Sequence, residues 1–341
     1  MCLIRHSQAR FNMIKVAVIG SNSFSGAHFI DLLLNSGQNE VIGISRSAEK
    51  EPLFLPYKRH KNPSFAFYRA DLNRNLRKVS RILEKFKPDY IVNFAGLIEV
   101  SSSWQYPEQY FQTNTVAIVA LINSLKNAFY LKRYVHISTP EVYGSCRNVL
   151  ENASYNPSTP YAVSKAATDM YLLALIRQTN FPAILIRSTN VYGPGQQLFR
   201  IIPKTIISLK QGSKIPLEGG GKAIKSYLNI KDVCRGIFLA MEKGKNGKIY
   251  HFSPEAGGKK VKQIVEVICL LMGYDFRKAT RTVKERPGQD KIYVINSNLA
   301  RKTLNWQPSI RLEDGIKEVI DWVEINWNKI QNMTLRYQHK F

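Results

Sequence analysis

Cysteine is scarce in this sequence, and long apolar runs are missing from it. The four cysteines among 341 residues are Cys2, Cys146, Cys234 and Cys269, and their spacing fits no metal-ligand motif. We therefore expect reduced thiols and no metal site. No apolar run reaches the roughly 18 residues of a membrane span, and residues 1–12 lack the apolar stretch of a secretion signal. These absences favour a cytoplasmic protein that enters no membrane.

Acidic residues are also few. The chain has 25 aspartates and glutamates against 49 lysines and arginines, which gives a formal net charge of +24 at pH 7. A charge of this size is common in proteins that bind nucleic acid or other anionic ligands. The basic residues are spread along the chain and gather only in short groups such as 57–61. We therefore expect a solvated basic surface that attracts an anionic small substrate, and no nucleic-acid partner.

An apolar segment at 14–19 is followed by a tight turn of small residues and then by an amphipathic segment. This pattern predicts a strand, a turn and a helix, which is the first unit of a dinucleotide-binding fold. Gly20 lets the backbone turn, and Gly26 permits close helix packing under a pyrophosphate. Ser23 stands where a second glycine is usual, and we expect it to adjust cofactor binding without abolishing it.

The second predicted strand, at 40–47, ends without the acidic residue that hydrogen-bonds an adenosine ribose. Ser45 and Arg46 stand there, and an arginine suits a 2′-phosphate, so we predict NADP as the cofactor, with NAD as the second choice. Further along, Asp71 is predicted to lie beside the adenine amine. The segment 89–96 is predicted to be a fourth strand whose end passes the cofactor.

Tyr161 and Lys165 are four residues apart, which puts them one turn apart on one face of a helix. A phenol has a pKa of about 10, but a nearby ammonium and an oxidised nicotinamide ring both favour the phenolate. Tyr161 is therefore a candidate base that removes a hydroxyl proton as hydride leaves the same carbon. Upstream, a predicted buried strand ends at Ser138, Thr139 and Glu141, where α/β sheets bind their ligands.

These segments resemble the extended short-chain dehydrogenase/reductase superfamily and, within it, the nucleotide-sugar 4,6-dehydratases. The resemblance runs from about Met13 to Trp322. Weaker matches follow in the same order, at 103–114, 187–195, 286–290 and 304–308. The resemblance implies an α/β fold, with a Rossmann doubly wound parallel sheet and a smaller interleaved α/β substrate-binding lobe.

The resemblance also implies roles for individual residues. The catalytic residues it implies are Thr139, Glu141, Tyr161 and Lys165. The cofactor-binding residues are Gly20, Ser23, Phe24, Ser25, Gly26, Ser45, Arg46, Asp71, Leu72, Ala95, Tyr161 and Lys165. The residues expected to bind the substrate, a nucleotide-diphosphate sugar, are Ser138, Asn190, Arg200, Lys225 and Arg286. Lys225 stands where the family usually has an arginine, so a bidentate phosphate contact becomes a point charge there.

Glu141 is the residue that favours the dehydratases. In the related dehydratases the threonine holds the sugar 4-hydroxyl and the glutamate removes the C5 proton, whereas typical 4-epimerases have no acid there. Some members carry an aspartate between the two that protonates the leaving C6 hydroxyl, but here the position is Pro140, which has no proton to give. The expected product is a 4-keto-6-deoxy sugar nucleotide. A nucleotide-sugar 4-epimerase and a UDP-glucuronate decarboxylase stay open as alternatives, as does a nucleic-acid-binding protein on an inactive dehydrogenase scaffold.

No internal repeat or low-complexity linker divides the chain, so the two lobes are expected to interleave. Residues 13–187 with 226–252 are predicted to form the NAD(P)-binding Rossmann domain, and 188–225 with 253–325 the nucleotide-sugar-binding domain. Residues 1–12 are predicted to be a flexible N-terminal extension, which makes Met13 a candidate natural start. Residues 326–341 are predicted to be a C-terminal tail.

The helix predicted around Tyr161 continues through 170–176, a stretch that is apolar on more than one face. This pattern favours burial at a subunit interface, and in the superfamily such helices pair across a dimer, so we expect a homodimer. His136 and His251 lie in apolar strand-like contexts. We predict that they are packed core residues and not catalytic bases.

Overall fold

Seven parallel strands form the central sheet, in the order β12-β7-β5-β4-β1-β2-β3. The computed structural model describes residues 13–60, 64–254, 257–285, 288 and 290–339. The predicted extension at 1–12 lies outside these ranges, as does Arg286. The strands are β1 (Ile14–Ile19), β2 (Asn39–Ser45), β3 (Phe65–Arg69), β4 (Tyr90–Asn93), β5 (Arg133–Ile137), β7 (Ala183–Ser188) and β12 (Ile249–Phe252). This order confirms the predicted doubly wound sheet.

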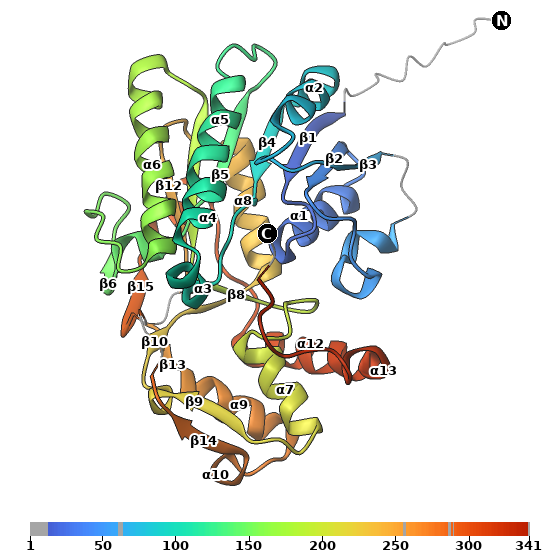
Figure 1. The fold of residues 1–341 in the computed structure, drawn as a ribbon, viewed down its shortest axis with the longest axis vertical. Coiled ribbons are helices and arrows are strands. Elements are labelled where there is room, and N and C mark those ends of the chain that lie inside the picture. The colour runs from blue at the N-terminus through green and yellow to red at the C-terminus, as the bar shows by residue number, and fades with distance from the viewer. Residues whose placement is uncertain (1–12, 61–63, 255–256, 286–287, 289, 340–341) are drawn as a thin grey trace, which may run out of the picture.

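Both faces of this sheet are covered by helices. Side chains alternate along a strand, so Val16 and Val18 of β1 pack on one face while Ala17 and Ile19 pack on the other. The first face carries α1 (Phe24–Asn35), α8 (Ile230–Lys243) and α11 (Asn298–Leu304). The second face carries α2 (Leu76–Phe86), α5 (Ala117–Ser124) and α6 (Pro160–Thr179), and Figure 1 shows α5 and α6 side by side. Burial on both faces explains why the inner strands β1, β4 and β7 are mostly apolar.

A smaller lobe lies beyond the carboxyl ends of these strands (Figure 1). Its four-stranded sheet has the order β13-β10-β15-β6, and the pairs β9 with β14 and β8 with β11 form two-stranded sheets. The strands are β6 (Cys146–Val149), β8 (Asn190–Tyr192), β9 (Ile215–Glu218), β10 (Ile224–Lys225), β11 (Tyr227–Asn229), β13 (Lys259–Lys260), β14 (Thr280–Val283) and β15 (Ile292–Ile295). The helices are α7 (Ile201–Lys210), α9 (Val261–Met272), α10 (Phe276–Ala279), α12 (Leu312–Ile325) and α13 (Trp327–Ile330).

The two lobes interleave more closely than the predicted boundaries imply. Strand β6, from the segment assigned to the cofactor domain, pairs with β15 of the smaller lobe. Conversely, α11 packs in the core of the large sheet, and the Trp306 ring packs against Phe252 at an interplanar angle of 53°, with ring centroids 4.7 Å apart. Residues 298–306, which we assigned to the sugar-nucleotide lobe, thus return to the sheet because their apolar side chains are buried there. The domain division stays a prediction.

Short elements link these layers and carry much of the site. They are α3 (Val100–Gln105), α4 (Pro107–Phe111), the π-helical turn Gln112–Val116 and the 3-10 turns Pro52–Phe54, Pro56–Arg59, Pro140–Tyr143 and Gly219–Gly221. Among the described residues, no helix is both long and apolar enough to cross a membrane. In the same part of the chain, no group of three or more His, Cys, Asp and Glu side chains is placed to hold a metal ion. The cysteines described there, Cys146, Cys234 and Cys269, are buried free thiols.

Candidate active site

The turn between β1 and α1 has the geometry that the small residues predict. Gly20 has a φ of +82°, and a Cβ atom there would lie 2.7 Å from the Ala95 backbone nitrogen. A Cβ on Gly26 would lie 2.5 Å from the Gly20 carbonyl oxygen. Ser23 caps α1, since its Oγ accepts a hydrogen bond from the Gly26 N–H at 3.0 Å. Ser23, in the place of a glycine, therefore orders the turn and keeps the start of α1 close to it.

Ser45 braces this turn from the end of β2. Its Oγ lies 3.1 Å from the Ser21 Oγ and accepts a hydrogen bond from the Asn22 N–H at 3.0 Å. The side chain is 8 % exposed. The Ser45 hydroxyl, predicted to contact the cofactor, is thus engaged inside the protein. Sequence alone does not say which way this side chain points.

Arg46 follows on the outer side and lines a cavity of about 460 Å³ with Asp71. The Asp71 carboxylate accepts a hydrogen bond from the Asn73 N–H at 2.9 Å. Leu72 is buried in the core of the sheet, on the side of α2. The remaining residues of this cavity are Asn73, Arg74, Leu97, Glu108, Gln109, Gln112 and Thr113. An arginine and an aspartate therefore share the cavity beside the ends of β2 and β3.

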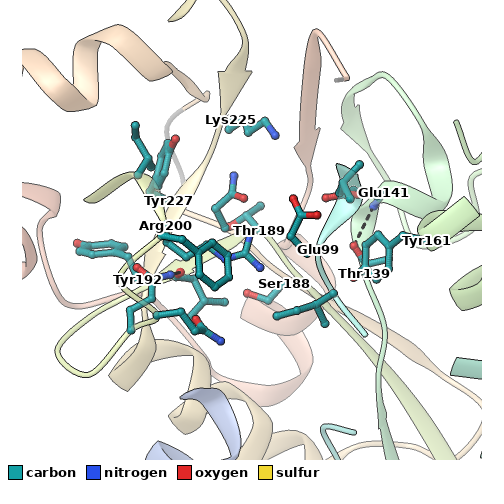
Figure 2. Close-up of a pocket in the computed structure, with 18 of the residues that line it drawn as sticks. Glu99, Thr139, Glu141, Tyr161, Ser188, Thr189, Tyr192, Arg200, Lys225 and Tyr227 are labelled. Atoms are coloured by element: carbon teal, nitrogen blue, oxygen red, sulfur yellow. Dashed lines mark hydrogen bonds between the residues drawn. The ribbon is translucent and has the colours of Figure 1, made fainter. Parts of the chain in front are cut away.

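A second cavity, of about 380 Å³, lies between the two lobes and brings together most of the predicted site residues. Those from the cofactor side are Ser23, Phe24, Ser25, Ala95, Ser138, Thr139, Glu141, Tyr161 and Lys165. Those from the smaller lobe are Asn190, Arg200 and Lys225. In Figure 2, Thr139, Glu141 and Tyr161 stand together on one side of this pocket, and Arg200 stands on the other.

Thr139 and Glu141 owe their positions to the turn after β5. Thr139 caps the 3-10 turn Pro140–Tyr143, and its Oγ1 accepts a hydrogen bond from the Glu141 N–H at 3.3 Å. Pro140 suits the first position of such a turn because its N–H is not needed there. Tyr161 lies in the first turn of α6, which Thr159 caps through the Ala162 N–H at 3.2 Å. A helix start and a strand end thus meet at the cavity.

The protein alone does not lower the pKa of Tyr161. Burial raises the pKa of the phenol, and the negative charge of Glu141 raises it further. A hydrogen bond with Thr139 and the positive charge of Arg200 act in the opposite direction. We expected a neighbouring ammonium to favour the phenolate. In the protein without a cofactor, however, burial raises the Tyr161 pKa by more than the nearby groups lower it.

Lys165 is buried below Tyr161 in α6. Its Nζ donates a hydrogen bond to the Ile137 carbonyl oxygen at 2.7 Å and lies 3.4 Å from the His136 Nε2. Burial lowers the pKa of Lys165 to about 8, although Asp169 acts to raise it. Burial, Lys165 and Arg187 all hold the pKa of His136 well below its usual range. His136 is fully buried, which confirms the prediction that it packs in the core.

A buried ion pair lies behind this group. Asp169 and Arg187 are both fully buried, and their Oδ2 and Nη2 atoms lie 2.8 Å apart. Arg187 also donates hydrogen bonds to the hydroxyls of Tyr143 and Tyr155. The Ser138 hydroxyl donates to Asp169 Oδ2 at 2.6 Å. Ser138 was predicted to bind substrate, and the structure holds its hydroxyl toward the protein interior because the buried carboxylate needs partners.

The smaller lobe supplies polar and cationic groups to the opposite wall. The Asn190 amide accepts a hydrogen bond from the Tyr293 hydroxyl at 2.6 Å and donates to the Ser226 carbonyl oxygen at 3.3 Å. The Lys225 ammonium lies 5.0 Å from the centroid of the Tyr293 ring. The Arg200 guanidinium lies 5.1 Å from the centroid of the Phe199 ring. Two cations therefore face a cavity that holds a carboxylate on its far side.

Sequence reasoning missed three residues of this site. Glu99, another carboxyl that lines the cavity, caps α3 by accepting a hydrogen bond from the Ser102 N–H at 2.6 Å. Tyr293 comes from β15, and Tyr110 of α4 lies edge-on to Tyr161 with ring centroids 6.3 Å apart. Tyr110 lies inside the segment 103–114, and Glu99 and Tyr293 lie three residues beyond the segments 89–96 and 286–290, but none of the three is one of the residues that define those motifs. The apolar run before Glu99 was a usable signal, because it ends at the same edge of the sheet.

Comparison with known proteins places this geometry in a family. Residues 18–319 match the family model described as GDP-mannose 4,6 dehydratase. The chain is 29 % identical over 336 residues to a dTDP-glucose 4,6-dehydratase of Haemophilus influenzae, covering 92 % of this chain and 99 % of the relative. The structure resembles a dTDP-glucose 4,6-dehydratase of Bacillus anthracis solved in complex with NAD, with a TM-score of 0.84 and 27 % identity. That match covers 93 % of this chain and 98 % of the other.

Other activities share the fold. A UDP-glucuronic acid 4-epimerase of Bacillus cereus has a TM-score of 0.83 and 23 % identity, with 92 % of this chain and 99 % of that chain covered. At that identity the likeness concerns the fold alone. The family model, by contrast, covers most of the chain and includes every predicted catalytic residue. The chain therefore belongs to the nucleotide-sugar 4,6-dehydratase family of the extended short-chain dehydrogenases/reductases.

Proposed function

We propose that this protein converts a nucleotide-diphosphate hexose to the 4-keto-6-deoxy sugar nucleotide by internal hydride transfer. The observation that carries the proposal is the meeting of Thr139, Glu141 and Tyr161 at one cavity whose opposite wall has Arg200 and Lys225. The first group supplies a base and a carboxyl beside a hydroxyl. The two cations suit a diphosphate, which is the anionic part of such a substrate.

The residues present fit a nicotinamide dinucleotide. Gly20 and Gly26 keep the turn free of Cβ atoms, so a pyrophosphate can approach the backbone N–H groups at the start of α1. Ser23, Phe24 and Ser25 line the cavity there. The relative from Bacillus anthracis was solved with NAD. Arg46 lines the cavity at the end of β2, which supports our prediction of NADP over NAD for this chain.

In the first half of the reaction, Thr139 holds the sugar 4-hydroxyl and Tyr161 takes its proton. A bound nicotinamide dinucleotide would supply the hydride acceptor for C4 and the hydride donor for C6. Lys165 lies one helical turn below Tyr161 and supplies positive charge there. Because burial and Glu141 raise the pKa of Tyr161, the phenol needs nearby positive charge to act as a base near neutral pH.

In the second half, Glu141 acts twice. It removes the C5 proton, which the adjacent 4-keto group has made acidic, and then donates that proton to the leaving C6 hydroxyl, so that water departs. Pro140 has no proton to give, and Glu99 caps α3 with one of its carboxyl oxygens. We assign both steps to Glu141 because it stands beside Thr139 and Tyr161 in the cavity (Figure 2). C5 regains a proton from solvent.

The test is a mass-spectrometric screen of the purified protein against GDP-mannose and the dTDP, UDP, CDP and GDP forms of glucose and N-acetylglucosamine, without added reductant. Loss of the mass of one water from one substrate supports the proposal and identifies the nucleotide. Isomerisation at unchanged mass would favour a 4-epimerase. No reaction with any of these sugars would favour the alternatives, and loss of carbon dioxide from UDP-glucuronate would identify the decarboxylase.

We also predict a homodimer formed through α5 and α6. Val163 and Met170 of α6 and Val116 beside α5 are 38 %, 58 % and 53 % exposed, so apolar side chains face outward where these helices lie together. Exposed apolar side chains that gather on neighbouring helices favour a partner surface. Light scattering of the purified protein measures the mass directly. The cytoplasmic location stays a prediction.

A further inference from the structure

The chain continues beyond α13 through a turn at 331–333 into an irregular segment, and we call residues 331–339 the C-terminal segment. The family model ends at residue 319, so this segment is not part of what the family match covers. Its side chains alternate: Gln331, Met333, Leu335, Tyr337 and His339 are half-buried, and the residues between them are exposed. Alternation of this kind indicates a segment that lays one face on the protein.

The segment is anchored in the smaller lobe. Ile330, just before it, is fully buried in the core formed by α7, α9 and α12. Met333 and Leu335 pack against the same core. Gln211, at the end of α7, donates a hydrogen bond to the Gln331 carbonyl oxygen at 2.8 Å. The first half of the segment is therefore held by apolar burial and does not depend on the contacts that follow.

The second half of the segment crosses to the other lobe. The Tyr337 ring packs edge-on to Phe199 of the smaller lobe, with ring centroids 5.2 Å apart. The His339 ring stacks on Tyr106 at 4.4 Å, and its Nε2 lies 2.7 Å from the Gln109 Oε1 of α4. Figure 1 shows the segment rising from α13 toward the C mark between the lobes. Two residues thus bridge both walls of the cleft.

These contacts lie at the site. Tyr337 forms a hydrogen bond with Tyr110, and the Tyr110 ring lies edge-on to Tyr161. Tyr110 also donates a hydrogen bond to the Glu99 carbonyl oxygen. Gln109, which His339 contacts, lines the cavity that holds Arg46. The positive charges of Arg46 and Arg200, from the two walls of the cleft, both act on the Tyr337 hydroxyl.

We propose that the C-terminal segment is a strap across the cleft that retains a bound nicotinamide dinucleotide, with Tyr337 and His339 as its closing contacts. The ligand in this inference rests on the proposed function. Retention matters for that reaction because the hydride is stored on the dinucleotide between the two halves, so the cofactor should not leave within a turnover. The anchor at Leu335 stays in place while the last residues open and close.

The first experiment compares the release rate of the reduced dinucleotide from the full chain and from a chain that ends at Leu335. That truncation keeps Ile330, Met333 and Leu335, so the core of the smaller lobe is intact. Release is followed by nicotinamide fluorescence after chase with excess unlabelled oxidised dinucleotide. Loss of the two aromatic contacts, with Tyr106 and with Phe199, predicts about tenfold faster release from the truncated chain.

Point variants separate the strap from a general loss of order. Tyr337→Ala should release the dinucleotide faster, whereas Gln338→Ala, at an exposed neighbouring position, should behave as the full chain does. Equal release rates for the full and truncated chains would overturn the strap. Tighter binding by the truncated chain would also overturn it, because the segment would then compete with the dinucleotide.

A second measurement separates this inference from the proposed function. Hydrogen–deuterium exchange of α4 and of residues 197–200 should rise in the truncated chain without any ligand, because both lose their bridge. If the full chain binds no dinucleotide, the proposed function fails, and this exchange still decides whether the segment ties the lobes. Unchanged exchange in both regions would contradict the bridge itself.

Discussion

The Glu141 carboxylate raises the pKa of the buried Tyr161 phenol. Their charges are coupled, since a negative Glu141 disfavours the phenolate and a protonated Glu141 does not. The proposed reaction uses both groups in turn, Tyr161 at the C4 hydroxyl and Glu141 at C5 and C6. A substitution of Glu141 alone should therefore separate C4 oxidation, which uses Tyr161, from the loss of water, which uses Glu141.

Glu141→Gln should stop the loss of water while leaving substrate binding and C4 oxidation in place. It should also move the pH dependence of C4 oxidation to lower pH, because removing the negative charge lowers the Tyr161 pKa. Single-turnover absorbance of the reduced nicotinamide measures the first step, and mass spectrometry measures water loss.

The matched control is Glu99→Gln, which removes another carboxyl of the same cavity and keeps an oxygen to cap α3. It should retain water loss within a few-fold of the wild type. Wild-type turnover in Glu141→Gln, or equal loss in both variants, would contradict the role given to Glu141.

Lys165 should make stability depend on pH in a defined window. Its pKa is lowered to about 8 in the folded protein, from 10.5. Between these values the unfolded chain holds a proton that the folded chain has lost, so the free energy of unfolding rises with pH there. In urea unfolding without cofactor, the free energy of unfolding of the wild type should rise by roughly 1–3 kcal/mol relative to Lys165→Met as the pH increases from about 8 to 10.5. If the difference in free energy of unfolding between the two proteins does not change with pH, Lys165 is not a buried amine with a lowered pKa.

The Asp169–Arg187 pair should contribute strongly to the free energy of unfolding. Asp169→Asn leaves a fully buried guanidinium with one charge partner fewer and removes the acceptor of Ser138, so we expect a loss of about 3–5 kcal/mol in the free energy of unfolding. The comparison is Lys132→Met, which breaks the exposed pair with Asp89 at 3.0 Å and should cost under about 1 kcal/mol. Similar costs for the two variants in urea unfolding would refute the burial argument.

Gly20→Ala should harm the turn that faces the dinucleotide. The new Cβ would lie 2.7 Å from the Ala95 nitrogen at a φ of +82°, so both the collision and the backbone conformation are unfavourable. Gly37 has a similar φ of +66°, but a Cβ there would meet open space. Gly37→Ala should therefore lower the free energy of unfolding by only the roughly 1–2 kcal/mol that a left-handed conformation costs. Gly20→Ala should cost more and weaken dinucleotide binding, while Gly37→Ala should bind normally. Equal binding by the two variants in calorimetry would contradict the assignment of this turn.

The sequence predicted those parts of the fold and site that local spacing controls. Tyr161 and Lys165 share a helix face because they are four residues apart, and Thr139 and Glu141 follow a strand end directly. Burial of the inner strands on both faces of the large sheet follows in the same way from their mostly apolar sequences.

Tertiary packing decided the rest. Ser45 and Ser138 were correctly placed at strand ends, but their hydroxyls turn toward Ser21 and Asp169, which no local pattern reveals. Tyr293 reaches the cavity from β15, and Tyr337 arrives from the last residues of the chain. Contacts between segments this far apart depend on the fold as a whole, so spacing along the chain does not encode them.

The most direct test of internal hydride transfer follows one deuterium. A substrate found in the screen is labelled at C4 and converted without added reductant. We predict a product that has lost one water, keeps the deuterium and carries it at C6, as read by mass spectrometry and nuclear magnetic resonance. Deuterium lost to solvent, or a product that keeps all its oxygens, would contradict the account.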